Sequence, residues 1–331
     1  MNNSDFQKIL QEYEKRHIQE VKALEERKSK IYKEIPKIKE IDEELTDFSL
    51  ITIKGILNNK NDAIKALNDK FDTLKLEKAK LLKEAGFPKD FLSMHYTCPL
   101  CKDSGYISQD GLTVMCSCLQ QKILDAKYND SNVSTAKNQT FETFDLNLYS
   151  DVANKEKYNS TISPRKNMEN IKKVTLNFVD NFDDENVKNL LFSGGTGLGK
   201  TYLSNCIVSS LLNKGKTVIY QTAPVMLDKL IADMFDKNNV SNSFSENLLT
   251  ADLLVIDDLG TETMNSLKFS ELYKIINTRL LNQNNKVTKT IISTNLSLQQ
   301  LFETYDERLV SRFVGHYDIF KFFGEDIRFK H

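Results

Sequence analysis

The stretch LLFSGGTGLGKTYL, Leu190–Leu203, decides the fold that we expect for this chain. Its part from Gly194 to Thr201 follows the pattern G-x-x-x-x-G-K-[ST] without a mismatch. The run NLLFS before it is typical of a strand, and TYLSNCIVSSLLNKG after it predicts an amphipathic helix that ends at Gly215. A glycine-rich turn between a strand and a helix surrounds phosphate with backbone N–H groups, and the helix dipole adds to the attraction. The stretch therefore predicts a nucleotide site.

Two side chains of this loop have roles of their own in the prediction. Lys200 is expected to reach the β- and γ-phosphates of ATP, and the hydroxyl of Thr201 to bind Mg²⁺. The residues expected to hold the nucleotide are Gly194, Gly195, Thr196, Gly197, Leu198, Gly199, Lys200 and Thr201.

Polar residues at the ends of two later strands fit the same chemistry. The apolar run LLVIDDLG ends in Asp257 and Asp258. Asp257 is expected to hold Mg²⁺ through its water shell, and Asp258 to orient or deprotonate the attacking water. TIISTN predicts another strand, which ends in Asn295 where the amide can contact the γ-phosphate or the water.

Three arginines are candidates for stabilising charge in the transition state. DERLVSRF sets Arg308 and Arg312 one helical turn apart, so both can face one direction. A planar, permanently charged guanidinium suits a phosphate undergoing transfer. The alternative for either arginine is a surface ion pair with Asp306 or Glu307. FFGEDIRF adds Arg328, which also has a surface role as its alternative.

The alternation of strand-like and helical segments from Phe141 onward predicts the fold class. Short β-rich runs alternate there with helical segments; the runs are NLLFSG, TVIYQT, LLVIDDLG, TIISTN and YDIFKFF. Such alternation means a parallel sheet with helices on both faces. We therefore expect an α/β fold with a P-loop core.

The first 85 or so residues are highly charged, with apolar residues at helical spacing. One stripe is Phe6, Leu10, Tyr13, Val21, Leu24 and Ile31, and a second is Ile64, Leu67, Phe71, Leu74 and Leu81, interrupted by Lys78. This spacing predicts a seam between paired helices, with breaks at Pro36 and near 57–62. We expect a small helical hairpin or bundle, which is either a solvated structural coil or a docking module for another protein.

Four of the five cysteines lie close together in the sequence, as Cys98, Cys101, Cys116 and Cys118. Two tight pairs of thiolates can close a tetrahedron around Zn²⁺, and four thiolates leave no open position for catalysis by the metal. We expect a structural four-cysteine zinc site, with His95 as a reserve ligand and redox chemistry as the alternative. Cys206, on the helix after the phosphate loop, is expected in the core.

Composition limits the remaining possibilities. The net charge of −1 does not indicate nucleic-acid binding by bulk charge, although a local basic patch is still allowed. The polar start MNNSDFQKIL has no apolar signal-peptide core, and no run approaches the roughly 20 apolar residues of a membrane helix. We expect a cytoplasmic protein without a membrane partner.

The order of these motifs resembles the AAA+ ATPase core and, more narrowly, the bacterial replicative-helicase loaders of the DnaC/DnaI type. The boxes LLVIDDLGTE, IISTNLS and GEDIR look like those of that family, and QTFETFDLNLYS (139–150) is similar to its entry segment. The stretch from GFP to YTCPLCKDSGY and the helices before it are similar to loader N-terminal domains. The resemblance implies Asp257 and Asp258 as the Walker B pair, Asn295 as sensor 1, Arg312 as the arginine finger and Arg328 as sensor 2.

Some features depart from that pattern. Many AAA+ proteins carry Asp-Glu where this chain has Asp-Asp, so the catalytic carboxylate is one methylene shorter. After GEDIR we expect neither a full helical lid domain nor the C-terminal helix-turn-helix of an origin-binding initiator. APVMLDKLIADMFDKNN (223–239) takes the place of a helix that faces single-stranded DNA in loaders, although it can equally be a packing helix. Lys229 and Lys268 are candidate phosphate contacts.

The expected organisation is 1–95, a helical partner-docking region; 96–126, a zinc module with four cysteine ligands; 127–140, a linker; and 141–331, an AAA+ ATPase domain. The expected function is ATP-dependent loading of the hexameric replicative DNA helicase, held by the N-terminal domain, onto single-stranded DNA, with self-assembly on the helicase. One alternative is an IstB-like transposition helper ATPase, whose relatives lack such a zinc-bearing front end. Another is a zinc-containing adaptor that does not hydrolyse ATP. The expected cofactors are ATP, Mg²⁺ and Zn²⁺.

Overall fold

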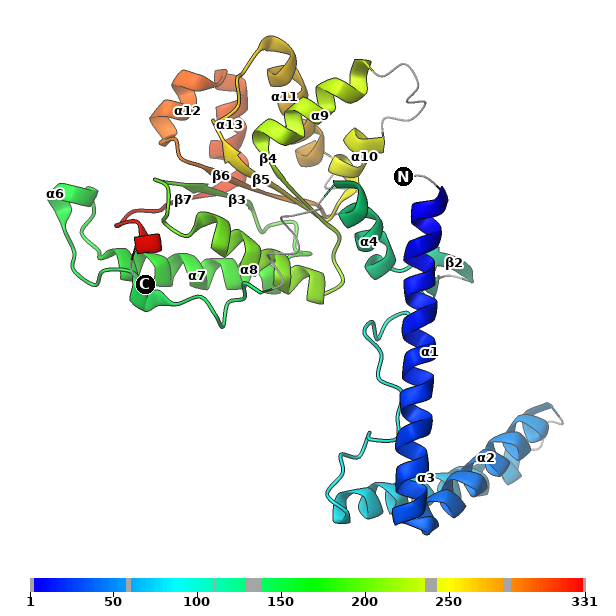
Figure 1. The fold of residues 1–331 in the computed structure, drawn as a ribbon. Coiled ribbons are helices and arrows are strands. Elements are labelled where there is room, and N and C mark those ends of the chain that lie inside the picture. Colours follow the sequence, from blue (N-terminus) through cyan, green and yellow to red (C-terminus); the bar gives the residue numbers. More distant parts are fainter. Residues whose placement is uncertain are drawn as a thin grey trace. The chain divides into compact units, whose positions relative to one another are not determined.

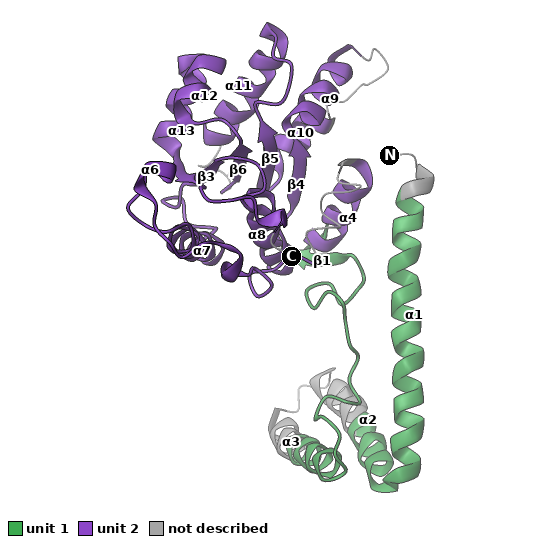
Figure 2. Ribbon diagram, turned by 60° about the vertical axis from the view of Figure 1, so that its left-hand side comes forward, with its two compact units in different colours: residues 1–116 green, residues 117–331 purple. Residues whose placement is uncertain are grey.

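The computed structural model of this chain describes residues 3–57, 61–109, 111–128, 138–235, 243–281 and 287–329. The chain divides into two compact units, Met1–Cys116 and Ser117–His331, shown in two colours in Figure 2. Each unit is described by itself.

Unit 1 is built mainly from three helices. They are α1 (Asn3–Glu34), α2 (Pro36–Leu57) and α3 (Asn61–Glu84). The break predicted at Pro36 is confirmed, since α2 begins at this residue. Proline is well suited to the first position of a helix, because an N–H group there would have no partner within the helix. The second predicted break, near 57–62, falls partly on residues 58–60, which lie outside the described residues.

The predicted apolar seam is only partly buried. Tyr13 and Ile31 on α1 are 4% and 0% exposed, whereas Val21 between them is 37% exposed. Ile31 packs with Ile38 of α2 and Leu82 of α3, so the three helices share a core near the C-terminal end of α1. The predicted seam is therefore buried at Tyr13 and Ile31 and partly exposed to solvent at Val21 between them.

A two-stranded antiparallel hairpin separates the two pairs of cysteines. It consists of β1 (Tyr106–Gln109) and β2 (Leu112–Met115). Gly105 and Gly111 flank β1 with positive φ angles of 77° and 80°, conformations that glycine adopts without strain. The hairpin brings the segment with Cys116 back to the segment with Cys101, and Cys116 N–H donates to Gly105 O at 2.9 Å.

Unit 2 contains a five-stranded sheet whose strand pairs are all parallel. Its order is β4-β5-β6-β3-β7. The strands are β3 (Asn189–Ser193), β4 (Val218–Thr222), β5 (Leu253–Leu259), β6 (Lys289–Thr294) and β7 (Tyr317–Lys321). All five predicted strands are present, and the first strand, β3, lies between the fourth and the fifth.

Helices cover both faces of this sheet (Figure 1). One face carries α7 (Pro164–Asp180) and α8 (Lys200–Asn213), and the opposite face carries α9 (Ala223–Phe235), α10 (Ser243–Thr250), α11 (Ser266–Leu281), α12 (Leu298–Thr304) and α13 (Glu307–His316). Two apolar clusters, one on each side of the sheet, form the core. The predicted α/β class, a parallel sheet with helices on both faces, is confirmed.

The sheet edge at β4 is covered by α4 (Ser117–Tyr128), the helix that directly follows Cys116. The side-chain amide of Gln121 pairs with the backbone of Val218 as a neighbouring strand would. Val218 N–H donates to Gln121 Oε1 at 2.6 Å, and Gln121 Nε2 donates to Val218 O at 2.9 Å. An edge strand with unpaired backbone groups favours such cover. Consequently, unit 2 starts at Ser117 and includes residues that we assigned to the zinc module and linker; most of that linker, 129–137, lies outside the described residues.

Three short elements complete unit 2. They are η1 (Leu146–Leu148), α6 (Lys155–Tyr158) and η3 (Ile327–Phe329). Among the helices in the described ranges, none is long and apolar enough to span a lipid bilayer.

Candidate functional site

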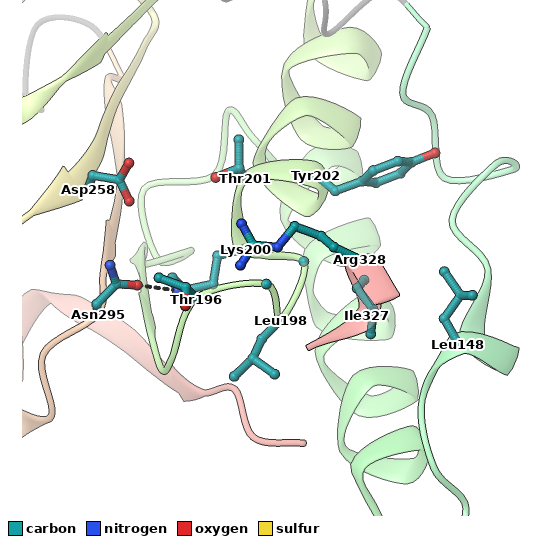
Figure 3. A pocket seen from close by; sticks show the side chains of 12 residues that line it. Leu148, Thr196, Leu198, Lys200, Thr201, Tyr202, Asp258, Asn295, Ile327 and Arg328 are labelled. Carbon is teal, nitrogen blue, oxygen red and sulfur yellow. Dashed lines mark hydrogen bonds between the residues drawn. The ribbon is translucent and has the colours of Figure 1, made fainter. Parts of the chain in front are cut away.

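A cavity of ≈ 480 Å³ opens at the carboxyl ends of β3, β5 and β6 (Figure 3). Its lining includes six of the eight residues of the predicted phosphate loop, together with groups from the strand ends and from the segment after β7. The lining residues are Leu148, Thr196, Gly197, Leu198, Gly199, Lys200, Thr201, Tyr202, Asp258, Asn295, Ile327 and Arg328. The order of strands explains this convergence, since β3 lies next to β6 and the two strand ends meet at the same edge of a parallel sheet.

The loop between β3 and α8 needs glycine at two crowded positions. Gly194 has φ 151°, and a Cβ atom there would lie 2.3 Å from Phe322 O. Gly197 has φ 69°, and a Cβ atom there would lie 2.0 Å from Oδ1 of Asp326. Ile327 N–H donates to Gly197 O at 2.9 Å. The segment after β7 thus packs directly on the phosphate loop, and any side chain at these glycines would force the two apart.

Lys200 points into the loop. Its Nζ donates to the carbonyl oxygens of Gly194 and Gly195, each at 2.7 Å, and to Asn295 Oδ1 at 2.8 Å (Figure 3 shows the last bond). Burial lowers the pKa of the ammonium group, and the carboxylates of Asp258 and Asp257 counteract that effect. The predicted phosphate lysine and the predicted sensor residue are therefore in direct contact.

Asp257 lies at the centre of a hydrogen-bond network below the cavity. Its Oδ2 accepts from Thr201 Oγ1 at 3.1 Å and from Tyr220 OH at 2.7 Å, and its Oδ1 accepts from Ser293 Oγ. The contact between Thr201 and Asp257 joins the two residues that we predicted to hold Mg²⁺. A hydroxyl and a carboxylate are oxygen ligands of the kind that Mg²⁺ prefers, so the donor set fits this ion.

Asp258 is half-buried at the cavity wall, with the backbone in the left-handed region at φ 55°. Its N–H donates to Ser293 Oγ at 3.1 Å and to Asp257 Oδ1 at 3.2 Å. Burial raises the pKa of the Asp258 carboxyl, the neighbouring Asp257 raises it further, and Lys200 opposes both. This carboxylate points into the cavity in Figure 3, where a base for water would have to be.

Arg328 also lines the cavity, but in an ion pair. Its Nη2 lies 2.5 Å from Asp326 Oδ2, and its Nε donates to both carboxylate oxygens of Asp326 at 3.0 and 3.1 Å. The structure thus places Arg328, the predicted sensor 2 residue, at the cavity, where the carboxylate of Asp326 holds its guanidinium.

The two other predicted arginines do not line this cavity. Arg308 is exposed and forms an ion pair with Asp306 at 2.8 Å, which is the surface role we considered as its alternative. Arg312 Nη2 donates to Tyr273 OH at 2.9 Å, and its guanidinium lies 5.2 Å from the centre of the Tyr273 ring. In the described part of the chain, Arg312 Nε is buried without a hydrogen-bond partner.

The two lysines considered as DNA contacts both have protein partners. Lys268 forms an ion pair with Asp228 at 2.6 Å. Lys229 lies over the ring of Phe244 and donates to Lys127 O at 3.3 Å. These contacts give neither lysine a distinct role at the cavity.

The predicted cysteine cluster forms. The Sγ atoms of Cys98, Cys101, Cys116 and Cys118 all lie within 4.8 Å of one another. The Sγ atoms of Cys98 and Cys116 are 3.8 Å apart, and a tetrahedron with metal–sulfur bonds of about 2.3 Å has edges of about 3.8 Å. This geometry and four soft donors fit Zn²⁺.

The surroundings of the cluster support its shape. The buried carboxylate of Asp103 accepts from the N–H groups of Thr97 and Cys98, each at 2.8 Å. His95, our reserve ligand, is outside the set and instead donates its backbone N–H to Glu20 Oε1 at 2.9 Å. Cys206 is fully buried in the core of unit 2, as predicted.

Sequence reasoning missed Tyr220 and Ser293, the two further hydroxyl donors to Asp257. A usable signal existed: each lies two residues after a buried apolar residue of the α8 face, Val218 or Ile291, and one or two residues before its strand ends. Without the strand order, however, nothing indicated that these two strands lie on either side of β5.

The part of the chain that carries this cavity matches known proteins. Residues 137–331 match the family described as IstB-like ATP binding protein. The replicative helicase loader DnaC of Escherichia coli K12 is 27% identical over 135 residues, which cover 41% of this chain and 53% of the loader. The chromosomal replication initiator DnaA of Wolinella succinogenes is 35% identical over 124 residues, 38% of this chain and 27% of the initiator.

Two solved structures show the same similarity. A crystal structure of the DnaC helicase loader aligns with a TM-score of 0.45 and 22% identity, over 57% of this chain and 99% of that chain. The structure of DnaI aligns with a TM-score of 0.44 and 19% identity, over 59% and 93%. In sequence, the chain spans about half the length of the curated loaders it matches.

Proposed function

The chain belongs to the family of IstB-like ATP binding proteins, and we propose that it is an ATPase that loads a replicative DNA helicase onto single-stranded DNA. One observation carries the ATPase part: Lys200, Asp258 and Asn295 come from three separate elements and line one cavity behind a phosphate loop. The loader part rests on the similarity to proteins named replicative helicase loader.

In this proposal the loop holds the phosphates of ATP through its backbone N–H groups and Lys200. Lys200 exchanges its bonds to Gly194 and Gly195 carbonyls for phosphate oxygens, which are stronger acceptors because they are charged. Thr201 and Asp257 would hold Mg²⁺, which would neutralise charge on the phosphates.

Hydrolysis then needs a base and groups that stabilise charge. Asp258 accepts a proton from the attacking water as the bond from that water to the γ-phosphorus forms and the bond to the β,γ-bridging oxygen breaks. Asn295 orients the water or contacts the γ-phosphate, and Arg328 contacts the same phosphate after leaving Asp326. Arg312, away from its own cavity, would serve the cavity of a neighbouring copy.

The remaining parts of the proposal concern partners. Unit 1, with its charged helices, is the proposed docking part for the hexameric helicase. The four-part division at 95, 126 and 140 stays a prediction beside the two units of the structure. In this role the protein would self-assemble on the helicase, contact single-stranded DNA and act in the cytoplasm.

A transposition helper is the second candidate, and the family description favours it directly. The cysteine cluster favours the loader, since we expect IstB-like helper ATPases to lack such a zinc-bearing front end. A non-hydrolysing adaptor is disfavoured by Lys200, Asp258 and Asn295, which line the cavity together.

An unwinding assay with the cognate replicative helicase tests the proposal. Full-length protein with ATP should increase helicase loading on a single-stranded tail, and Lys200→Ala should bind the helicase without loading it. If the full-length protein does not bind that helicase at all, the transposition-helper function becomes the better proposal.

A further inference from the structure

Three hydroxyl groups from three separate elements donate to the carboxylate of Asp257. Thr201 on α8 belongs to the phosphate loop and was expected; Ser293 on β6 and Tyr220 on β4 were not. Tyr220 comes from the strand on one side of β5 and Ser293 from the strand on the other, because β5 lies between β4 and β6 (Figure 1). Asp257 is 4% exposed, so these donors replace most of the water it would have in solution.

Register explains why a tyrosine reaches this carboxylate. Tyr220 pairs with Val255, and the two residues share the apolar cluster on the α8 face of the sheet. Asp257 lies two residues beyond Val255 and therefore faces the same side. The Tyr220 side chain, 2% exposed, packs in that cluster, and its hydroxyl donates to Asp257 Oδ2 at 2.7 Å. A phenylalanine would fill the same space without the bond.

The carboxylate has to keep one orientation to serve a hydrated Mg²⁺. The three hydroxyl donors contact both of its oxygens and so restrict the rotation of the carboxylate. Partners that orient a group bound to a metal commonly affect metal affinity as strongly as some ligands do. Of the three hydroxyls, only that of Tyr220 lies on the edge strand β4, outside the phosphate loop and the strand that ends in Asn295.

We propose that Tyr220 is a positioning residue for Mg²⁺: its hydroxyl holds the carboxylate of Asp257 oriented toward the ion. This inference rests on the proposed nucleotide site. It assigns part of the metal dependence of that site to a strand from which we predicted no functional residue.

Nucleotide binding by the full-length protein provides the test. A fluorescent ATP analogue is titrated with and without Mg²⁺ into wild type, Tyr220→Phe and Tyr305→Phe. Tyr305 is a matched control, since it is 3% exposed and also donates its hydroxyl to a carboxylate, that of Glu262, while not lining the cavity. Tyr220→Phe should raise the Mg²⁺ concentration needed for tight binding by about 10–100-fold and leave binding without Mg²⁺ unchanged. Tyr305→Phe should change neither.

A second measurement separates this role from a packing effect. In an Asp257→Asn background, Tyr220→Phe should no longer shift the Mg²⁺ dependence, because the carboxylate that the hydroxyl orients is gone. An unchanged Mg²⁺ dependence in Tyr220→Phe overturns the inference while the nucleotide site stands. An equal shift in both backgrounds, or in Tyr305→Phe, also overturns it. Wild-type protein that binds no nucleotide overturns the proposed function together with the inference.

Discussion

Lys200 Nζ donates a hydrogen bond to Asn295 Oδ1 over 2.8 Å, which joins the phosphate loop to the end of β6. Both side chains can bind a phosphate, and here they form a hydrogen bond with each other instead. A bound γ-phosphate would replace this bond by contacts of its own to Lys200 and Asn295, so the two residues should respond to ATP together. The bond thus connects nucleotide occupancy to a strand that runs through the centre of the sheet.

Replacing Lys200 tests the nucleotide site itself. Lys200→Ala removes a charged donor worth about 1.5–3 kcal/mol, so ATP should bind about tenfold more weakly or worse. Equilibrium titration with a fluorescent ATP analogue measures this. Lys268→Ala is the control, because Lys268 is paired with Asp228 and does not line the cavity. Equal affinities of Lys200→Ala and wild type would contradict the site assignment.

Replacing Asp258 tests the proposed base. Asp258→Asn should keep ATP binding and slow hydrolysis by about 10²–10⁴-fold, since the attacking water loses its proton acceptor. Steady-state phosphate release measures the rate. Similar turnover in the variant and wild type would show that another group activates the water.

The pH dependence of hydrolysis follows from the same carboxyl. Burial and Asp257 raise the pKa of Asp258 above its usual value of 3.8. A base acts only when ionised, so the wild-type rate should decline as the pH falls through this raised pKa, at a higher pH than an ordinary aspartate would give. The residual rate of Asp258→Asn should lack this decline. A wild-type profile that is flat down to the usual range of aspartate would contradict the assignment.

Arg312 should act between copies of the chain. Arg312→Ala and Lys200→Ala should each be inactive alone, and mixing them should restore part of the activity, because one copy supplies the arginine and the other the phosphate site. An arginine finger contributes about 10³–10⁵-fold in rate. Arg308→Ala is the control, since Arg308 is exposed and paired with Asp306. Absence of complementation under assembly conditions would argue for a structural role of Arg312 beside Tyr273.

The cysteine cluster should hold about one zinc ion per chain. Cys101→Ser should lose the metal and destabilise unit 1, because the hairpin of β1 and β2 lies between the two cysteine pairs and the metal would fix its ends. ATP binding should stay mostly intact. Elemental analysis and thermal unfolding measure the two effects. Cys206→Ala, outside the cluster, should keep the metal. Protein purified without chelator that contains no zinc would refute the site.

The local patterns of the sequence determined a large part of this protein. The glycines between Gly194 and Thr201 specify a turn between a strand and a helix, because few other residues adopt its backbone angles. Lys200 in the same loop indicated phosphate as the ligand. The apolar runs located all five strands, and the cysteine spacing indicated the cluster. Each of these features depends on residues close together in the chain, where periodicity and turn chemistry are decisive.

Only the tertiary structure decided which distant residues meet. The insertion of β3 between β6 and β7 brings Lys200 to Asn295, and the placement of β5 between β4 and β6 brings Tyr220 and Ser293 to Asp257. Hydrophobicity assigns a residue to one face of a strand but does not indicate which strand is its neighbour. For the same reason the sequence left Arg308 and Arg312 equivalent, and only the packing of α13 on α11 placed Arg312 against Tyr273 while Arg308 remained exposed beside Asp306.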